Sequence, residues 1–180
     1  MRLLIDMDGV IADFEGEFLR RWRNLYPGKK YVPLEERRGF WLREQYPEEY
    51  QDLVQEIYHS PGFYQNLPPV SGAIEAVKEI SESLNNVFLC TSPMIPKYEN
   101  CVLEKYHWVY ENLGGDWINK IIVTKDKTVV RGDVLIDDMP EITGSMKPEW
   151  EHILYDQPYN RNIKNRKRLT WNNWKQILNL

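Results

Sequence analysis

Short apolar runs recur along the chain, and polar residues follow each of them. The runs cover residues 3–5, 87–90, 121–123, 134–136 and 153–155. Continuous apolar runs of this length are typical of strands that are buried on both faces of a parallel sheet. The residues that follow the runs are Asp6 and Asp8, Thr91 and Ser92, Thr124, Asp137 and Asp138, and Asp156. The pattern therefore predicts a sheet with one polar edge.

Helical spacing lies between several of these runs. Apolar residues at positions 73, 74, 77, 80 and 84 recur every three or four residues, and Ser71 precedes them as a helix cap. A second predicted helix covers residues 98–113 and ends at Gly114 and Gly115. Strands that alternate with helices predict an α/β fold with a parallel sheet and helices on both faces. Ligands of such folds bind beyond the carboxyl ends of the strands, which is where the polar residues lie.

The stretch from residue 17 to residue 69 does not follow this rhythm. It contains six prolines and many aromatic residues, and helical spacing is present only at residues 18–26 and 53–58. We interpret residues 17–69 as a small helical cap that is inserted after the first strand and covers the site. Residues 1–16 and 70–180 are then the catalytic core.

The composition narrows the class of protein. The chain of 180 residues is 42% hydrophobic, which is enough for a buried core, and its net charge is -4. These values exclude a wholly disordered chain and argue against a protein that mainly coats nucleic acid or an anionic membrane. No apolar run approaches the roughly 20 residues that span a bilayer. Acidic residues interrupt the N-terminal apolar stretch, and the two cysteines form no disulfide or zinc pattern, so we expect a cytoplasmic protein.

Four carboxylates converge if the first and fourth strands are neighbours. Asp6 and Asp8 follow the first strand, and Asp137 and Asp138 follow the fourth. Oxygen ligands suit Mg²⁺, and Lys127 adds a positive charge. Mg²⁺ and one lysine supply about +3, against about -4 from the carboxylates and roughly -1.5 to -2 from a phosphate monoester. This imbalance favours one protonated carboxyl group, which can act as the general acid of a phosphoryl transfer while another aspartate attacks phosphorus.

The motifs carry a resemblance to a known superfamily. Asp6-Met7-Asp8-Gly9-Val10, Thr91, Lys127 and Asp137-Asp138 resemble, in order, the four motifs of the haloacid dehalogenase (HAD) phosphatases. Nearly the whole chain is similar to the 5'(3')-deoxyribonucleotidases of that superfamily, most clearly at residues 38–41, 90–93, 126–130 and 150–152. The resemblance implies a HAD-like three-layer core with a helical cap, and Mg²⁺-dependent hydrolysis of deoxynucleoside monophosphates through an aspartyl-phosphate. It also implies a homodimer.

The resemblance further implies a role for each matching residue. Asp6 would be the nucleophile, and Asp8 would protonate the leaving group and then deprotonate the attacking water. Asp6, the backbone carbonyl of Asp8, and Asp138 would hold Mg²⁺ with Asp137 beside them, although the residues alone leave both of these last aspartates as candidate ligands. Thr91 and Lys127 would hold the phosphate with help from Ser92. The base and sugar would lie among aromatic side chains at Phe14, Phe40, Trp41 and Tyr58.

Two other functions fit parts of the sequence. One is a related phosphatase that acts on another small phosphate ester. The other is a non-catalytic protein that binds single-stranded nucleic acid through exposed aromatics and a basic run, which comprises Arg161, Lys164, Arg166, Lys167 and Arg168. The negative net charge argues against this last function, so we expect no nucleic-acid polymer and no membrane as partners.

Overall fold

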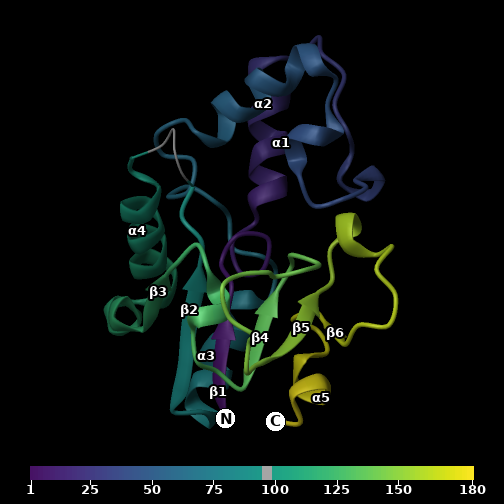
Figure 1. Ribbon diagram of the computed structural model, residues 1–180. Helices are drawn as coiled ribbons and strands as arrows, with labels where there is room; N and C mark the ends of the chain where they lie inside the picture. Colours follow the sequence, from purple (N-terminus) through teal and green to yellow (C-terminus); the bar gives the residue numbers. More distant parts are fainter. Residues whose placement is uncertain (95–98) are drawn as a thin grey trace.

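The computed structural model describes residues 1–94 and 99–180. Figure 1 shows a sheet whose strands point towards a separate group of helices, and both chain termini lie at the opposite end of the molecule. The strands are β1 (Arg2–Ile5), β2 (Asn86–Thr91), β3 (Ile121–Val123), β4 (Val134–Asp137), β5 (Glu151–Tyr155) and β6 (Arg168–Leu169). They form one sheet in the order β3-β2-β1-β4-β5-β6.

All neighbouring strands in this sheet are parallel, as the apolar runs predicted. β1 lies in the middle, where Leu3 pairs with Val87 of β2 on one side and with Val134 of β4 on the other. The carboxyl ends of β1, β2 and β4 therefore end side by side at one edge. The sequence pattern did not predict β6, because its two residues are too few to form an apolar run.

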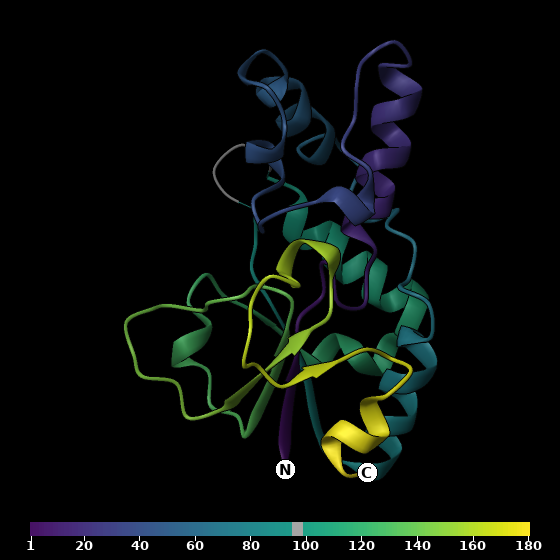
Figure 2. The same cartoon turned by 90° about the vertical axis from the view of Figure 1, so that its right-hand side faces the viewer.

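Both faces of the sheet are buried, which explains why the strands read as continuous apolar runs. Leu3 and Ile5 belong to the larger apolar cluster, which includes side chains from α3 (Ala73–Ser83), α4 (Cys101–Leu113) and α5 (Trp174–Leu178). Leu4 points the other way and packs with Trp150. That second face is covered by η5 (Lys127–Val129) and by the connection from β4 to β5 (Figure 2).

Two predicted helix boundaries differ from the observed ones. The predicted cap at Ser71 is wrong, because α3 begins one residue later than a Ser71 cap would place it. Gly72 occupies the cap position with φ +77 and makes no side-chain bond. The predicted start of the next helix, Tyr98, lies outside the described residues, and α4 is observed from Cys101. Its predicted end is confirmed, because Gly114 follows Leu113 with φ +100, a conformation that favours glycine.

The segment between β1 and α3 contains the helices that face the carboxyl edge of the sheet. It comprises α1 (Phe14–Leu25), η1 (Leu34–Glu36), η2 (Leu42–Gln45), η3 (Glu48–Tyr50) and α2 (Gln51–Tyr58). Trp22 of α1 is fully buried, and the rings of Phe18, Tyr26, Tyr46 and Tyr50 surround it at centroid distances of 4.7–5.9 Å. Much of the aromatic content of the chain is thus the packing of this segment.

Two short helices complete the described fold, η4 (Gly115–Lys120) and η6 (Pro158–Asn160). Within residues 1–94 and 99–180, no helix combines the length and the apolar character that a membrane span requires.

Candidate active site

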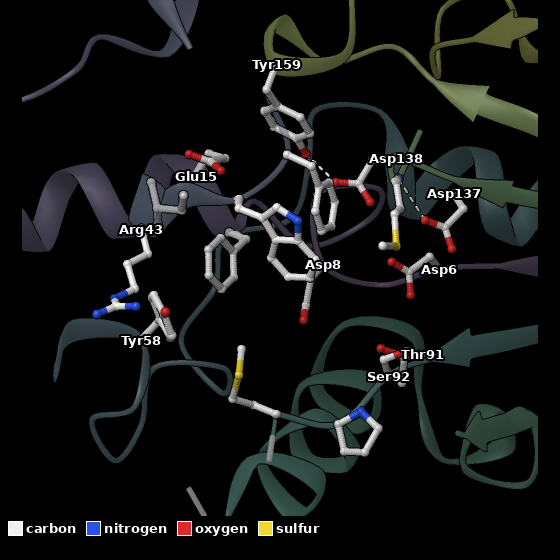
Figure 3. Close-up of a pocket in the computed structure, with 18 of the residues that line it drawn as sticks. Asp6, Asp8, Glu15, Arg43, Tyr58, Thr91, Ser92, Asp137, Asp138 and Tyr159 are labelled. Atoms are coloured by element: carbon white, nitrogen blue, oxygen red, sulfur yellow. Dashed lines mark hydrogen bonds between the residues drawn. The ribbon is translucent and has the colours of Figure 1, made fainter. Parts of the chain in front are cut away.

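A cavity of about 600 Å³ lies between the carboxyl ends of the strands and the α1–α2 segment. Every residue that the sequence predicted for the site lines it: Asp6, Asp8, Phe14, Phe40, Trp41, Tyr58, Thr91, Ser92, Lys127, Asp137 and Asp138. In Figure 3 the aspartates, Thr91 and Ser92 lie on the side of the strands, while Tyr58 and Arg43 lie across the cavity. The fold therefore brings together residues that are up to 132 positions apart.

The end of β1 places Asp6 and Asp8 at the floor of this cavity. The N–H of Asp6 still donates to the carbonyl of Ile136, so Asp6 extends the pairing of β1 with β4. The chain then turns back, with the N–H groups of Ile11 and Ala12 donating to the carbonyl of Met7. Gly9 makes this turn possible, because its φ is +75. The carboxylates of Asp6, Asp137 and Asp138 each offer an oxygen within 4.8 Å of the others, which is close enough to hold a metal ion.

Lys127 joins two of these carboxylates. Its Nζ lies 2.7 Å from Oδ1 of Asp6 and 2.5 Å from Oδ2 of Asp137, and its side chain is buried. Burial lowers the pKa of Lys127, but the negative charges of Asp137 and Asp6 outweigh burial and raise it above the usual value. Burial also raises the pKa of Asp137 to about 6, although Lys127 opposes this. Lys127 therefore stays cationic beside the nucleophile candidate.

Asp126 fixes the position of Lys127. The carboxylate of Asp126 accepts hydrogen bonds from both the N–H and the hydroxyl of Thr128, and likewise from Ser145. These bonds lower the pKa of Asp126 and tie η5 to the connection from β4 to β5. Gly144 is needed there, because a Cβ at its position would lie 1.9 Å from Oδ1 of Asp126.

The two neighbouring aspartates at the end of β4 differ in what their carboxylates contact. Both oxygens of Asp137 are engaged, by Lys127 and by the N–H of Met139 at 2.9 Å. Asp138 accepts one hydrogen bond at Oδ2, from the hydroxyl of Tyr159. Burial, together with the charges of Asp137 and Asp6, raises the pKa of Asp138 well above its usual value. A bound cation would relieve this repulsion, and Asp138 is the better placed of the two to contact it.

Lys105 is a second buried lysine of the site, and the sequence did not predict it. Its Nζ donates to Oδ2 of Asp8 at 2.6 Å and to the hydroxyl oxygen of Thr91 at 2.9 Å. Burial raises the pKa of Asp8, and the charge of Lys105 opposes this rise. A signal was present, because Lys105 shares the buried face of α4 with Cys101, Trp108 and Val109.

Aromatic side chains form the remaining walls of the cavity. The ring of Phe40 lies 5.1 Å from that of Trp41 and 6.1 Å from that of Tyr159. The side chain of Trp41 is 58% exposed, whereas Trp22 in the same segment is fully buried. Such exposure is unusual for tryptophan. Phe14 contacts Tyr58 at 5.8 Å from the α1 side. These rings give the cavity a wall of aromatic side chains, which suits a planar ligand.

Glu15, Arg37 and Tyr159 are further residues at the site that the sequence did not predict. Arg37 is 1% exposed and forms an ion pair with Glu15, and its guanidinium lies 5.7 Å from the ring of Tyr159. Burial raises the pKa of Glu15 to about 7, against the opposing charge of Arg37. The N–H of Gly39 donates to the carbonyl of Tyr159. The α1–α2 segment is thus joined through Tyr159 to Asp138.

The basic run near the C-terminus is largely paired with acidic residues. Arg161 and Arg168 both contact Asp156, at 3.3 and 3.0 Å, and Lys167 contacts Glu151 at 3.4 Å. Arg168 also donates to the backbone carbonyls of Asn160 and Ile163. Three of the five side chains of the run therefore make contacts within the fold around η6 and β6.

Comparisons with known proteins agree with this geometry. Residues 1–180 match the family model described as "5' nucleotidase, deoxy (Pyrimidine), cytosolic type C protein". A Bordetella pertussis protein provisionally named 5'(3')-deoxyribonucleotidase is 49% identical over 178 residues, which cover 99% of this chain and 95% of that protein. The human 5'(3')-deoxyribonucleotidase of cytosolic type is 47% identical over 188 residues, with 99% and 93% covered.

A solved structure shares the fold. It is a HAD family hydrolase from Deinococcus radiodurans, crystallised with bound phosphate and sodium. The two chains superpose with a TM-score of 0.57 at 13% identity, and the match covers 98% of this chain and 94% of that one. The predicted HAD-like fold is confirmed.

Proposed function

The chain belongs to the 5'(3')-deoxyribonucleotidase family, which makes it a phosphoric monoester hydrolase, and on this premise we propose that it converts deoxynucleoside monophosphates to deoxynucleosides and phosphate. The observation that carries the proposal is the cavity in which Asp6, Asp8 and Asp138 share the lining with aromatic side chains. An acidic site alone suits many phosphate esters, whereas the flat apolar walls suit a ligand with a planar base.

The donor set of the site fits Mg²⁺. The ligand atoms that Asp6 and Asp138 offer are carboxylate oxygens within 4.8 Å of each other, and hard divalent cations prefer oxygen ligands. Asp6, Asp138 and the backbone carbonyl of Asp8 would hold the ion, with Asp137 kept beside them by Lys127. When bound, Mg²⁺ neutralises charge on the phosphate and polarises it for attack.

The protein side chains would carry out two displacement steps. The carboxylate of Asp6 attacks phosphorus, the bond from phosphorus to the nucleoside oxygen breaks, and Asp8 gives that oxygen a proton. Asp8 then takes a proton from a water molecule that attacks the aspartyl-phosphate, which releases phosphate and regenerates Asp6. Lys127, Thr91 and Ser92 would hold the phosphate oxygens during both steps.

Phe14, Phe40, Trp41 and Tyr58 would enclose the base and the sugar. We propose that residues 17–69 act as the cap of the site and that residues 1–16 and 70–180 form the core. Met139 directly follows the paired aspartates Asp137 and Asp138. Its side chain faces the same cavity, so it is a candidate for setting the preferred base. The cytoplasmic location and the homodimer stay predictions.

Phosphate release from a panel of substrates tests the proposed function. The panel contains deoxyribonucleoside and ribonucleoside monophosphates with phosphate at the 5' or 3' position, and several sugar phosphates. We expect a deoxyribonucleoside monophosphate to have the highest kcat/KM in the presence of Mg²⁺, and EDTA to abolish turnover. A sugar phosphate that exceeds every nucleotide by tenfold or more would instead favour a phosphatase for another small ester.

Phe40→Ala tests the aromatic wall. Base stacking on an aromatic side chain is worth about 1–3 kcal/mol, so we expect KM for the preferred nucleotide to rise by about tenfold or more with a smaller change in kcat. Tyr110→Ala is the control, because Tyr110 is an exposed aromatic residue of α4 that lies outside the cavity lining. If KM is the same in Phe40→Ala and Tyr110→Ala, Phe40 does not contact the base.

A further inference from the structure

Lys105 contacts two residues of the site from a helix that carries none of the recognised motifs. Its ammonium donates to Oδ2 of Asp8 and to Oγ1 of Thr91, and its side chain is 1% exposed. The ring of Tyr64 is a further neighbour, with its centroid 5.2 Å from Nζ.

This arrangement separates the roles of the two buried lysines. Lys127 contacts Asp6 and Asp137, which leaves one donor hydrogen for a phosphate oxygen. Lys105 is not among the residues that line the cavity. Its effect on the reaction therefore passes through Asp8 and Thr91, which do line it.

The contact with Lys105 determines how Thr91 can bind. Lysine only donates hydrogen bonds, so the hydroxyl oxygen of Thr91 accepts from Lys105. The hydroxyl hydrogen of Thr91 is then directed elsewhere, and within the described residues no acceptor for it is found. At the wall of this cavity a phosphate oxygen is the natural acceptor.

The contact with Lys105 also distinguishes the two oxygens of Asp8. Oδ2 is held by the ammonium, while Oδ1 is buried and has no hydrogen-bond partner among the described residues. A buried carboxyl oxygen without a partner is costly, and a proton exchanged with the substrate would satisfy it. The side chain of Asp8 as a whole remains 26% exposed towards the cavity.

We propose that Lys105 is a positioning residue that holds Asp8 so that Oδ1 exchanges the proton, and that turns the hydroxyl of Thr91 into a donor for the phosphate. This inference rests on the proposed function. In the first step Asp6 forms a bond to phosphorus, and the electron pair of the breaking P–O bond goes to the leaving oxygen. That oxygen takes the proton from Oδ1 of Asp8 and leaves as a neutral alcohol. In the second step a water molecule returns a proton to Oδ1 as it attacks phosphorus.

Two substrates that differ in their leaving group test the proposal. The first is the best alkyl phosphate of the substrate panel, whose leaving oxygen is strongly basic and needs a proton. The second is p-nitrophenyl phosphate, which releases a weakly basic phenolate and needs no proton. We expect Lys105→Met to lower kcat/KM, which reports the first step alone, by about 100-fold or more on the alkyl phosphate and by less than about tenfold on p-nitrophenyl phosphate. Lys105→Gln, which keeps polarity at this buried position, is expected to show the same selectivity, and Lys105→Arg to restore part of the alkyl phosphate activity.

Glu104→Gln is the matched control on the same helix. Glu104 accepts hydrogen bonds from the N–H groups of Gly62, Tyr64 and Gln65, so its role is structural. We expect its variant to lower stability and to change both substrates by the same factor. Equal losses of kcat/KM on both substrates in the folded Lys105 variants, or no loss, would overturn the proposal. A wild type that hydrolyses alkyl phosphates but no nucleotide would overturn only the proposed substrate.

Discussion

Asp6→Asn is expected to lower kcat for the preferred nucleotide by at least about 10⁴-fold, the order of loss seen when a covalent nucleophile is removed. The amide has almost the shape of the carboxylate but does not attack phosphorus at a useful rate. It also removes one negative charge beside Lys127, whose Nζ lies 2.7 Å from Oδ1. Substrate binding should survive, because the aromatic walls and Thr91 are unchanged. Phosphate release measures the first effect, and the fluorescence of the exposed Trp41 on nucleotide addition measures the second.

Asp116→Asn is the control for this change, because Asp116 is exposed on η4, away from the cavity lining. It should keep the turnover of the wild type. Turnover by Asp6→Asn within about tenfold of the wild type would show that Asp6 is not the nucleophile, because a covalent mechanism cannot lose its nucleophile at so small a cost.

Gly9→Ala is expected to have the second largest effect, on metal binding as much as on folding. A Cβ at this position would lie 2.3 Å from Oδ2 of Asp138 and 2.7 Å from the hydroxyl of Tyr159, and the φ of +75 is unfavourable for alanine. The carboxylate of Asp138 then has to move, which breaks its hydrogen bond from the hydroxyl of Tyr159. We expect the free energy of unfolding to fall by about 1–3 kcal/mol and the affinity for Mg²⁺ to fall by about 10- to 100-fold. Denaturant unfolding and calorimetric titration with Mg²⁺ measure the two quantities.

Gly28→Ala provides the comparison at a glycine without such neighbours. No atom lies within 4 Å of a Cβ built at Gly28, and its φ is not in the left-handed region. This variant should stay within about 0.5 kcal/mol of the wild type. If Gly9→Ala binds Mg²⁺ as tightly as Gly28→Ala does, the crowding around Asp138 does not limit the metal site.

The strand ends were predictable from the sequence because one physical rule governs them. A parallel sheet brings the carboxyl ends of its strands to the same edge, so the polar residues after the apolar runs at Ile5 and Ile136 were expected at one edge. That these two strands are direct neighbours came from the structure. The aromatic wall was predictable only through the family resemblance. An aromatic side chain such as Trp22 in the same segment is core, and spacing does not distinguish it from Trp41.

Lys105 shows why the remainder of the site was not predicted. A lone lysine on a helix is usually solvated, and only the position of its partners in space makes it part of a site. With Lys105 included, two lysines and Mg²⁺ supply about +4, which balances about -4 from the four carboxylates. The excess of negative charge that the sequence led us to expect therefore arises only when the phosphate binds. Glu15 and Arg37 were not predicted for the same reason, because they pair with each other across 22 positions of the chain.

The central place of β1 in the sheet has a consequence for the dynamics of the enzyme. Hydrogen bonds hold β1 on both sides, and its three apolar side chains have no exposed surface. Local opening reaches such a strand last, so we expect the amides around the nucleophile candidate to be among the most slowly exchanging of the molecule. Any displacement that admits substrate is then expected in the opposite wall of the cavity, to which α1 and α2 contribute, while the strand that carries Asp6 keeps its geometry.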